Sequence, residues 1–141
     1  MQDYKENWLK LKEKHHKYCI FNNTNDLNMN IDFDNDGKLI GTFNCDEKYQ
    51  GYDEMMHGGI ISALIDSSMA QCLFGHGIVA YTVRLNIKFM KSILINKDIN
   101  IEINIEEKSD HFVNLLAKII QEDKVKVKAD AKFWILNEEE R

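Results

Sequence analysis

The sequence lacks three features that would each point to a particular class of protein: paired cysteines, basic clusters and long apolar runs. Its three cysteines are an odd number without CxxC spacing, which argues against a disulfide framework or a zinc site. We interpret Cys19, Cys45 and Cys72 as small core residues. No basic stripe offsets the net charge of −5, so nucleic acid is not an expected partner. No apolar run suits a membrane span or a signal peptide, and the cytoplasm is the expected location. Proline is absent, to which alone we give no functional weight.

A chain of 141 residues, with 44% apolar and 29% charged residues, predicts one domain over 1–141. Residues 3–19 are expected to form a surface helix, because Asp3 can cap it, Glu6 follows three positions later, and large side chains recur on one face. Those side chains are Tyr4, Trp8, Leu11, His15 and Tyr18. We interpret His15 and His16 as packing or solvent-facing residues, since paired histidines on such a helix are more often these than ligands.

Strand periodicity recurs along a core of about residues 28–136. Alternation of apolar and polar residues predicts six strands. They cover 28–34, 39–45, 81–89, 99–105, 113–119 and 125–135. The first two should form a hairpin at Asn35-Asp36-Gly37, and short polar turns make the last three antiparallel neighbours. In the strand 81–89, the odd-numbered residues from Tyr81 to Phe89 are expected to share one face.

The longest helical segment lies at the centre of the chain, between the second and third strands. Residues 57–75 begin with a Gly-Gly pair after His57 and end at Gly75, and apolar or small residues occur nearly all round the helix. A helix without a polar face needs cover on most sides. We therefore predict an α+β fold, in which an antiparallel six-stranded sheet wraps around one central helix and an extra helix precedes it.

Asp66 is an acidic residue in the middle of this apolar helix. The sequence has no Lys or Arg between Asp66 and Arg84, and a buried carboxylate must be paired or used. It could attack a carbonyl, activate water, or simply bond to Ser62, Ser67 or a backbone N–H. Gly58 and Gly59 leave the first N–H groups of the helix accessible, which favours an anionic oxygen, although glycines can also serve close packing.

Helix geometry limits how these two features can cooperate. Gly58 and Asp66 are eight residues apart, so they lie on one helix face at a separation of roughly 12 Å. They cannot act on the same carbonyl within one subunit. If both act on one bond, two helices must run antiparallel across a two-fold axis, and Gly58 of one subunit must meet Asp66 of the other. An enzyme of this design is an obligate dimer.

The runs YQGYDEMMHGGIISALIDSSMA and YTVRLNIKFMKSI resemble the hotdog-fold acyl-CoA thioesterases of the PaaI-like and 4-hydroxybenzoyl-CoA thioesterase group. The resemblance covers about residues 28–136, and its most specific part is His-Gly-Gly with an acidic residue nine positions after the His. It implies a hotdog fold, an oxyanion-binding N–H at Gly58, and catalysis by Asp66 of the opposite subunit. It also implies assistance by Thr82 and by an amide, for which Gln50 is the nearest candidate.

Further residues are candidates for contacts with the substrate. His57, Gly59 and Ser62 lie at the helix entry and should line the site. Arg84, Asn86 and Lys88 share one face of the strand 81–89. Its cations, with Lys91 just beyond it, could meet the phosphates of coenzyme A, although exposed strand cations more often only solvate a surface. Coenzyme A would be part of the substrate, and neither a cofactor nor a metal ion is expected.

The leading hypothesis is an acyl-CoA thioesterase, a homodimer or dimer of dimers that hydrolyses a fatty or aryl thioester. One alternative is an acyl-thioester dehydratase, but these resemble the chain in fold only and use a His and an acid in a different loop, usually with proline. Another is a non-catalytic module that binds acyl-CoA. The acyl group, the choice between coenzyme A and acyl carrier protein, and the choice between nucleophile and general base stay open.

Overall fold

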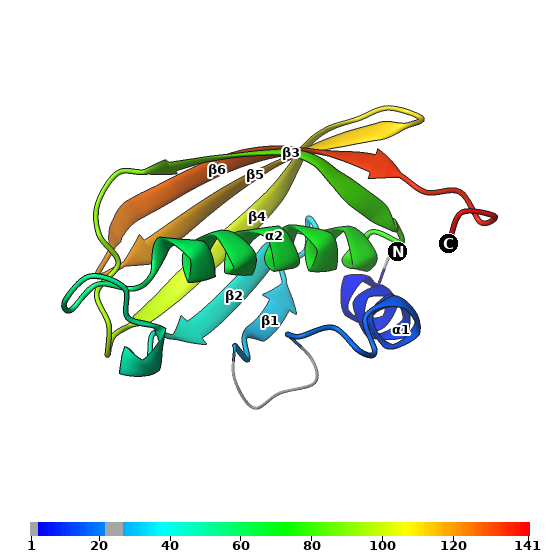
Figure 1. The fold of residues 1–141 in the computed structure, drawn as a ribbon. Coiled ribbons are helices and arrows are strands. Elements are labelled where there is room, and N and C mark those ends of the chain that lie inside the picture. The colour runs from blue at the N-terminus through cyan, green and yellow to red at the C-terminus, as the bar shows by residue number, and fades with distance from the viewer. Residues whose placement is uncertain (1–2, 22–26) are drawn as a thin grey trace.

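The computed structural model describes residues 3–21 and 27–141, and its two helices and six strands occur in the predicted order (Figure 1). The elements are α1 (Tyr4–His15), β1 (Asn30–Phe33), β2 (Leu39–Asn44), the short 3-10 helix η1 (Glu47–Tyr49), α2 (Gly58–Gly75), β3 (Ala80–Phe89), β4 (Asp98–Lys108), β5 (Phe112–Gln121) and β6 (Lys124–Ile135). The predicted α+β class, with one helix preceding the sheet and one at its centre, is confirmed.

All six strands form one antiparallel sheet in the order β1-β2-β4-β5-β6-β3. The predicted hairpin β1–β2 and the neighbouring strands β4, β5 and β6 are therefore confirmed. Glu122 and Asp123 both have positive φ, which a two-residue turn between twisted strands requires, and this turn fixes the β5–β6 register. Among the described strands, β3 pairs with β6 alone, the last strand of the chain, and therefore forms one edge of the sheet (Figure 1).

Helix α2 lies against the inner face of the sheet and supplies much of the core (Figure 1). Leu64, Ile65 and Met69 are fully buried against sheet residues, as the apolar composition of the helix predicts. The burial is not complete, however. A stripe of small residues and Asp66 stays half-exposed, on a side that the described helices and strands leave partly open. The stripe consists of Ser62, Ala63, Asp66 and Ala70.

Helix α1 is shorter than predicted. It begins as expected, with the Asp3 side chain accepting from the N–H of Glu6 at 3.0 Å, but it ends at His15 rather than at residue 19. His16 leaves the helical conformation, and its ring packs edge-on against Phe74 of α2 at 4.8 Å between centroids. A contact with α2 therefore ends the helix before its sequence periodicity does.

A second small core joins α1 to the C-terminal half of α2. Trp8 packs with Phe74, Val79 and Leu136, and its indole N–H donates to Gln71 Oε1 at 3.0 Å in a buried setting. The amide of Gln71 in turn donates to Ser67 Oγ at 3.1 Å. The hydrogen bond between Trp8 and Gln71 thus holds α1 at a defined position on α2.

We expect Trp8→Phe to lower the free energy of unfolding by about 1–3 kcal/mol, because the buried Gln71 oxygen loses its donor while most of the ring contact is kept. Urea unfolding followed by circular dichroism measures this loss. Lys10→Ala, on the exposed side of the same helix, is the matched control and should stay within about 0.5 kcal/mol of wild type. Equal stability of Trp8→Phe and Lys10→Ala would show that the bond contributes nothing.

Candidate active site at the start and middle of α2

His57 caps the N-terminus of α2. Its Nδ1 accepts from the N–H of Gly59 at 2.8 Å, and its carbonyl accepts from Ile60 and Ile61. Within the described part of the chain, the N–H of Gly58 has no acceptor. One backbone donor at the positive end of the helix dipole is thus left for a ligand, and Gly58 is exposed.

The space available for a side chain differs between Gly58 and Gly59. A Cβ added to Gly59 would stand 2.9 Å from the His57 ring, so a side chain there would disturb the cap. A Cβ added to Gly58 would stand 3.9 Å from the ring of Phe89, an ordinary contact distance. Close packing therefore explains Gly59, whereas it does not explain Gly58. Ser62, one turn later, donates to the Gly58 carbonyl at 2.9 Å.

Asp66 lies two turns along α2, on its half-exposed stripe, and bonds to β3. Thr82 Oγ1 donates to Asp66 Oδ1 at 2.6 Å, and this bond fixes the direction of the carboxylate. Its partner is therefore a threonine hydroxyl, not Ser62, Ser67 or a backbone N–H. Because residues 58–75 form one unbroken helix, the spacing of Gly58 and Asp66 remains roughly 12 Å.

A β-bulge in β3 aims Thr82 at the helix. The pairing with β6 shifts register between Thr82 and Arg84, so Val83 is an extra residue. A bulge reverses the alternation of faces beyond it, and such irregularities are common beside active sites. The predicted single face from Tyr81 to Phe89 is therefore wrong: Tyr81 and Val83 are 64% and 56% exposed, while Leu85 and Ile87 pack on the core.

Gln50 lies on the loop that precedes α2. Its Oε1 accepts from the N–H of Glu54 at 3.0 Å, and its backbone pairs with Met56, so the side chain stabilises the turn before the His57 cap. The amide is exposed, but its oxygen is engaged. This places Gln50 in the polypeptide segment that leads to Gly58.

Arg84, Asn86 and Lys88 lie on the outer face of the sheet, away from α2. Asn86 donates to Asp130 at 3.1 Å, and Lys88 is directly opposite Lys128 on β6. Asn86 and Lys88 line a surface hollow of about 560 Å³. Within one subunit, the structure does not bring these three candidates together with Gly58 and Asp66, so their contact with substrate stays a prediction.

Sequence reasoning missed the exposed apolar residues around this region. Phe89, whose ring is beside Gly58, is 52% exposed, and Met90 is 39% exposed. The alternating pattern predicts that Phe89 faces inward, but alternation alone does not indicate how much of an inward-facing side chain is covered. A pocket of about 540 Å³ between α1 and α2 is lined by Ser67 and Gln71, but neither Gly58 nor Asp66 lines it.

Other chemically reactive side chains are placed as packing residues. Burial raises the pKa of both the Cys45 and the Cys72 thiol to about 12, which removes them as nucleophiles, and both are core residues as predicted. Cys19 is only partly buried, contrary to expectation. Burial also lowers the pKa of His16, reinforced by His15 and opposed by the charge of Asp66.

No group of three or more His, Cys, Asp or Glu side chains among the described residues is arranged to hold a metal ion. None of the helices in the described ranges has the length and apolar character needed to cross a membrane.

Solved structures of similar fold are numerous, and we compared the chain with three proteins. The PaaI protein of Escherichia coli superposes with a TM-score of 0.78 at 14% identity, covering 96% of this chain and 94% of that one. A hypothetical thioesterase of Streptococcus pneumoniae, solved with coenzyme A, gives 0.73 at 17% identity, covering 78% and 90%. Another thioesterase superfamily protein gives 0.71 at 19% identity over 74% of this chain, which spans only 55% of that longer chain.

The sequence itself matches one protein family. The family profile described as Thioesterase superfamily aligns with residues 54–128, more than half of the chain, a range that includes Gly58, Asp66 and Thr82. No curated protein sequence matches significantly. The superpositions confirm the predicted hotdog fold, and the family match confirms the predicted class of thioester hydrolase. The chain belongs to the thioesterase superfamily, and its fold is the hotdog fold of the PaaI-like members.

Proposed function

We propose that the protein hydrolyses a fatty or aryl acyl-CoA to the free acid and coenzyme A. The observation that carries this proposal is the presence of two groups on α2: an N–H at Gly58 that has no acceptor among the described residues, and a carboxylate at Asp66 oriented by Thr82. An oxyanion-binding donor and an acid are the two groups that thioester hydrolysis requires. Coenzyme A enters as part of the substrate.

The proposal includes a homodimer, because the separation of roughly 12 Å keeps Gly58 and Asp66 from acting on one carbonyl within a subunit. Two features favour a second copy of the chain against α2. The half-exposed stripe of the helix holds small residues, and β3 presents an unpaired edge with exposed Tyr81 and Val83. An antiparallel pair of α2 helices across a two-fold axis gives two equivalent sites. Association into a dimer of dimers is part of the same proposal.

In each proposed site, the substrate carbonyl oxygen accepts from the Gly58 N–H of one subunit. Asp66 of the partner subunit takes a proton from water as the new O–C bond forms. The thioester C–S bond then breaks, and the proton passes to the sulfur of the departing coenzyme A. Direct attack by Asp66, followed by hydrolysis of the anhydride, is the alternative route. The Gln50 amide, whose Nε2 has no acceptor among the described residues, holds the water, and His57, Gly59 and Ser62 line the entry.

The Streptococcus pneumoniae thioesterase supports the choice of residues. It has been solved as two alanine mutants, one at an aspartate and the other at a threonine sixteen positions later. Asp66 and Thr82, joined by a hydrogen bond, have the same separation in this chain. The coenzyme A bound to that protein supports coenzyme A as the carrier. We retain Arg84, Asn86 and Lys88 as proposed contacts for its phosphates, and the cytoplasm as the proposed location.

Thiol release from a panel of acyl-CoAs tests the reaction, with chains from short to long and with phenylacetyl and benzoyl groups. We expect turnover of at least one member and a ranking that identifies the acyl group. No turnover on any member, together with intact acyl-CoA binding, would favour the non-catalytic module instead. Hydration of a crotonyl thioester would favour the dehydratase.

A mixture of two inactive variants tests the shared site. Gly58→Pro removes the N–H and Asp66→Asn removes the carboxylate, so a heterodimer of the two has one site with both groups intact and one with neither. After random exchange of subunits, activity should return to about a quarter of the wild-type rate, since half of the dimers are mixed and each has one working site of two. Each variant alone, treated identically, is the control. No recovery in a mixture with proven subunit exchange would contradict the shared site.

A further inference from the structure

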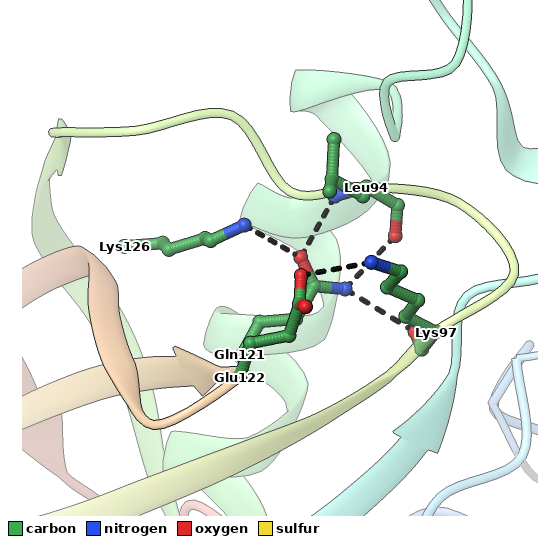
Figure 2. A network of polar contacts seen from close by, with 5 residues as sticks. All are labelled: Leu94, Lys97, Gln121, Glu122 and Lys126. Carbon is green, nitrogen blue, oxygen red and sulfur yellow. Dashed lines mark hydrogen bonds and ion pairs between the residues drawn. The ribbon is translucent and has the colours of Figure 1, made fainter.

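Gln121 is a buried amide with all of its hydrogen-bonding capacity used. It ends β5 and is 1% exposed, and its four polar contacts all reach residues outside that strand (Figure 2). Its Oε1 accepts from Leu94 N–H at 2.9 Å and from Lys126 Nζ at 2.9 Å. Its Nε2 donates to the carbonyls of Leu94 at 2.9 Å and Lys97 at 3.3 Å. The amide thus pairs with both backbone groups of Leu94, as a neighbouring strand would.

The segment held in this way, residues 90–97, connects β3 to β4. Its start is fixed by two bonds from Met90 and Lys91 N–H to the Lys126 carbonyl, at 2.9 and 3.0 Å. Ile93 is buried in the core. Between Ile93 and the start of β4, the Gln121 amide holds the backbone from inside the protein, and the exposed ion pair of Lys97 with Glu122 adds a contact at the surface.

The same segment supports the start of α2. Residues 54–56 run antiparallel to residues 93–95, and Met55 bridges to Leu94. Two backbone hydrogen bonds complete the pairing, from Met56 N–H to the Ile93 carbonyl at 2.8 Å and from Ile95 N–H to the Glu54 carbonyl at 3.2 Å. Residues 57 and 58, the helix cap and the free donor, follow directly. Two contacts therefore link the Gln121 amide to the segment that carries the Gly58 N–H: its hydrogen bonds to Leu94, and the pairing of residues 93–95 with residues 54–56.

We infer that Gln121 is a positioning residue for the oxyanion donor, acting through residues 93–95 and 54–56 on the Gly58 N–H. This inference rests on the proposed function. Without the amide, both polar groups of Leu94 lose a buried partner, and the support beneath residues 54–56 loosens. A donor displaced by about 1 Å can lower the rate by about 10²-fold, although the mutation is far from the reacting atoms.

Gln121→Met keeps the length of the side chain and removes every hydrogen bond. We expect kcat to fall about 10- to 100-fold while KM changes less than about threefold, because the displaced donor acts on the transition state. Gln121→Glu keeps an acceptor for Leu94 and Lys126 but loses both donors. It replaces Gln121→Met in this kinetic test if that variant does not fold. Glu122→Gln, which breaks only the exposed pair with Lys97, is the matched control and should leave kcat unchanged.

A double variant separates positioning from general weakening of the structure. In a Gly58→Pro background the donor is already gone, so Gln121→Met should lower kcat little further. A reduction equal to that in the wild-type background would overturn the inference, and so would wild-type kcat in Gln121→Met.

Hydrogen exchange provides a readout that does not depend on activity. Gln121→Met should speed exchange in peptides covering residues 54–60 and 93–97, while the Glu122→Gln control should not. Faster exchange with no turnover by the wild type would uphold the positioning and refute the proposed reaction. Unchanged exchange in residues 54–60 would overturn the positioning whatever the activity.

Discussion

Asp66→Asn should lower kcat for acyl-CoA hydrolysis by about 10²- to 10⁴-fold, the usual contribution of a positioned acid or base. The amide has the shape of the carboxylate, and its oxygen can still accept the hydroxyl of Thr82, so the local structure is kept. What is lost is the negative charge that removes a proton from water or attacks the carbonyl. Thiol release under saturating substrate measures the change.

The matched control for Asp66→Asn is Asp98→Asn. Asp98 is also an aspartate that accepts a side-chain hydrogen bond, from Asn44, but it is exposed at the start of β4 and lies outside the proposed site. It should retain kcat within about twofold, because a surface substitution away from the site usually has a small effect. Equal rates for wild type and Asp66→Asn would remove this residue from the mechanism, provided that both proteins have the same oligomeric state.

Gly58→Pro should lower kcat by about 10²- to 10³-fold, the effect of removing one oxyanion donor. Proline has no N–H, yet it is well tolerated at the first position of a helix, where that N–H has no partner within the helix. The preceding residue, His57, already has the extended conformation that a following proline requires, with φ −61° and ψ 129°. The substitution therefore deletes the donor while leaving the helix free to form.

Gly58→Ala isolates the donor from the side chain. It adds a Cβ in ordinary contact with Phe89 and keeps the N–H, so its kcat should be far closer to wild type than that of Gly58→Pro. Thermal unfolding of both variants checks that the helix is intact. A rate loss of similar size in the two variants would indicate that crowding at the helix start, rather than the missing donor, is responsible.

Most of the fold could be predicted from local sequence patterns. The apolar composition of residues 57–75 and the period-two alternation of the strands reflect which side chains the core needs, and these elements are confirmed. The end of α1 and the bulge at Val83 could not be predicted in this way. Each depends on a contact with a distant element, the ring of Phe74 in one case and the pairing with β6 in the other.

The sequence indicates the members of the candidate site to a lesser extent. Asp66 was conspicuous as a carboxylate in an apolar helix, and Gly58 as part of a glycine pair, because both break the pattern of their own segment. The role of Thr82 came only from the resemblance, and the structure places it on the Asp66 carboxylate. Gln121 gave no signal, since a glutamine at the end of a strand is ordinary until the backbone of residues 94–97 is placed against it.

The strand order has a consequence for how the chain folds during synthesis. β3 is made before β4 and β5, but its partner among the described strands is β6, the last one. Until β6 emerges from the ribosome, the strand edges of β3 and β5 that pair with it have no native partner. Pairings between segments so distant in sequence form slowly, and unpaired strand edges promote aggregation meanwhile. The nascent chain should therefore depend on chaperones until its final strand has been released.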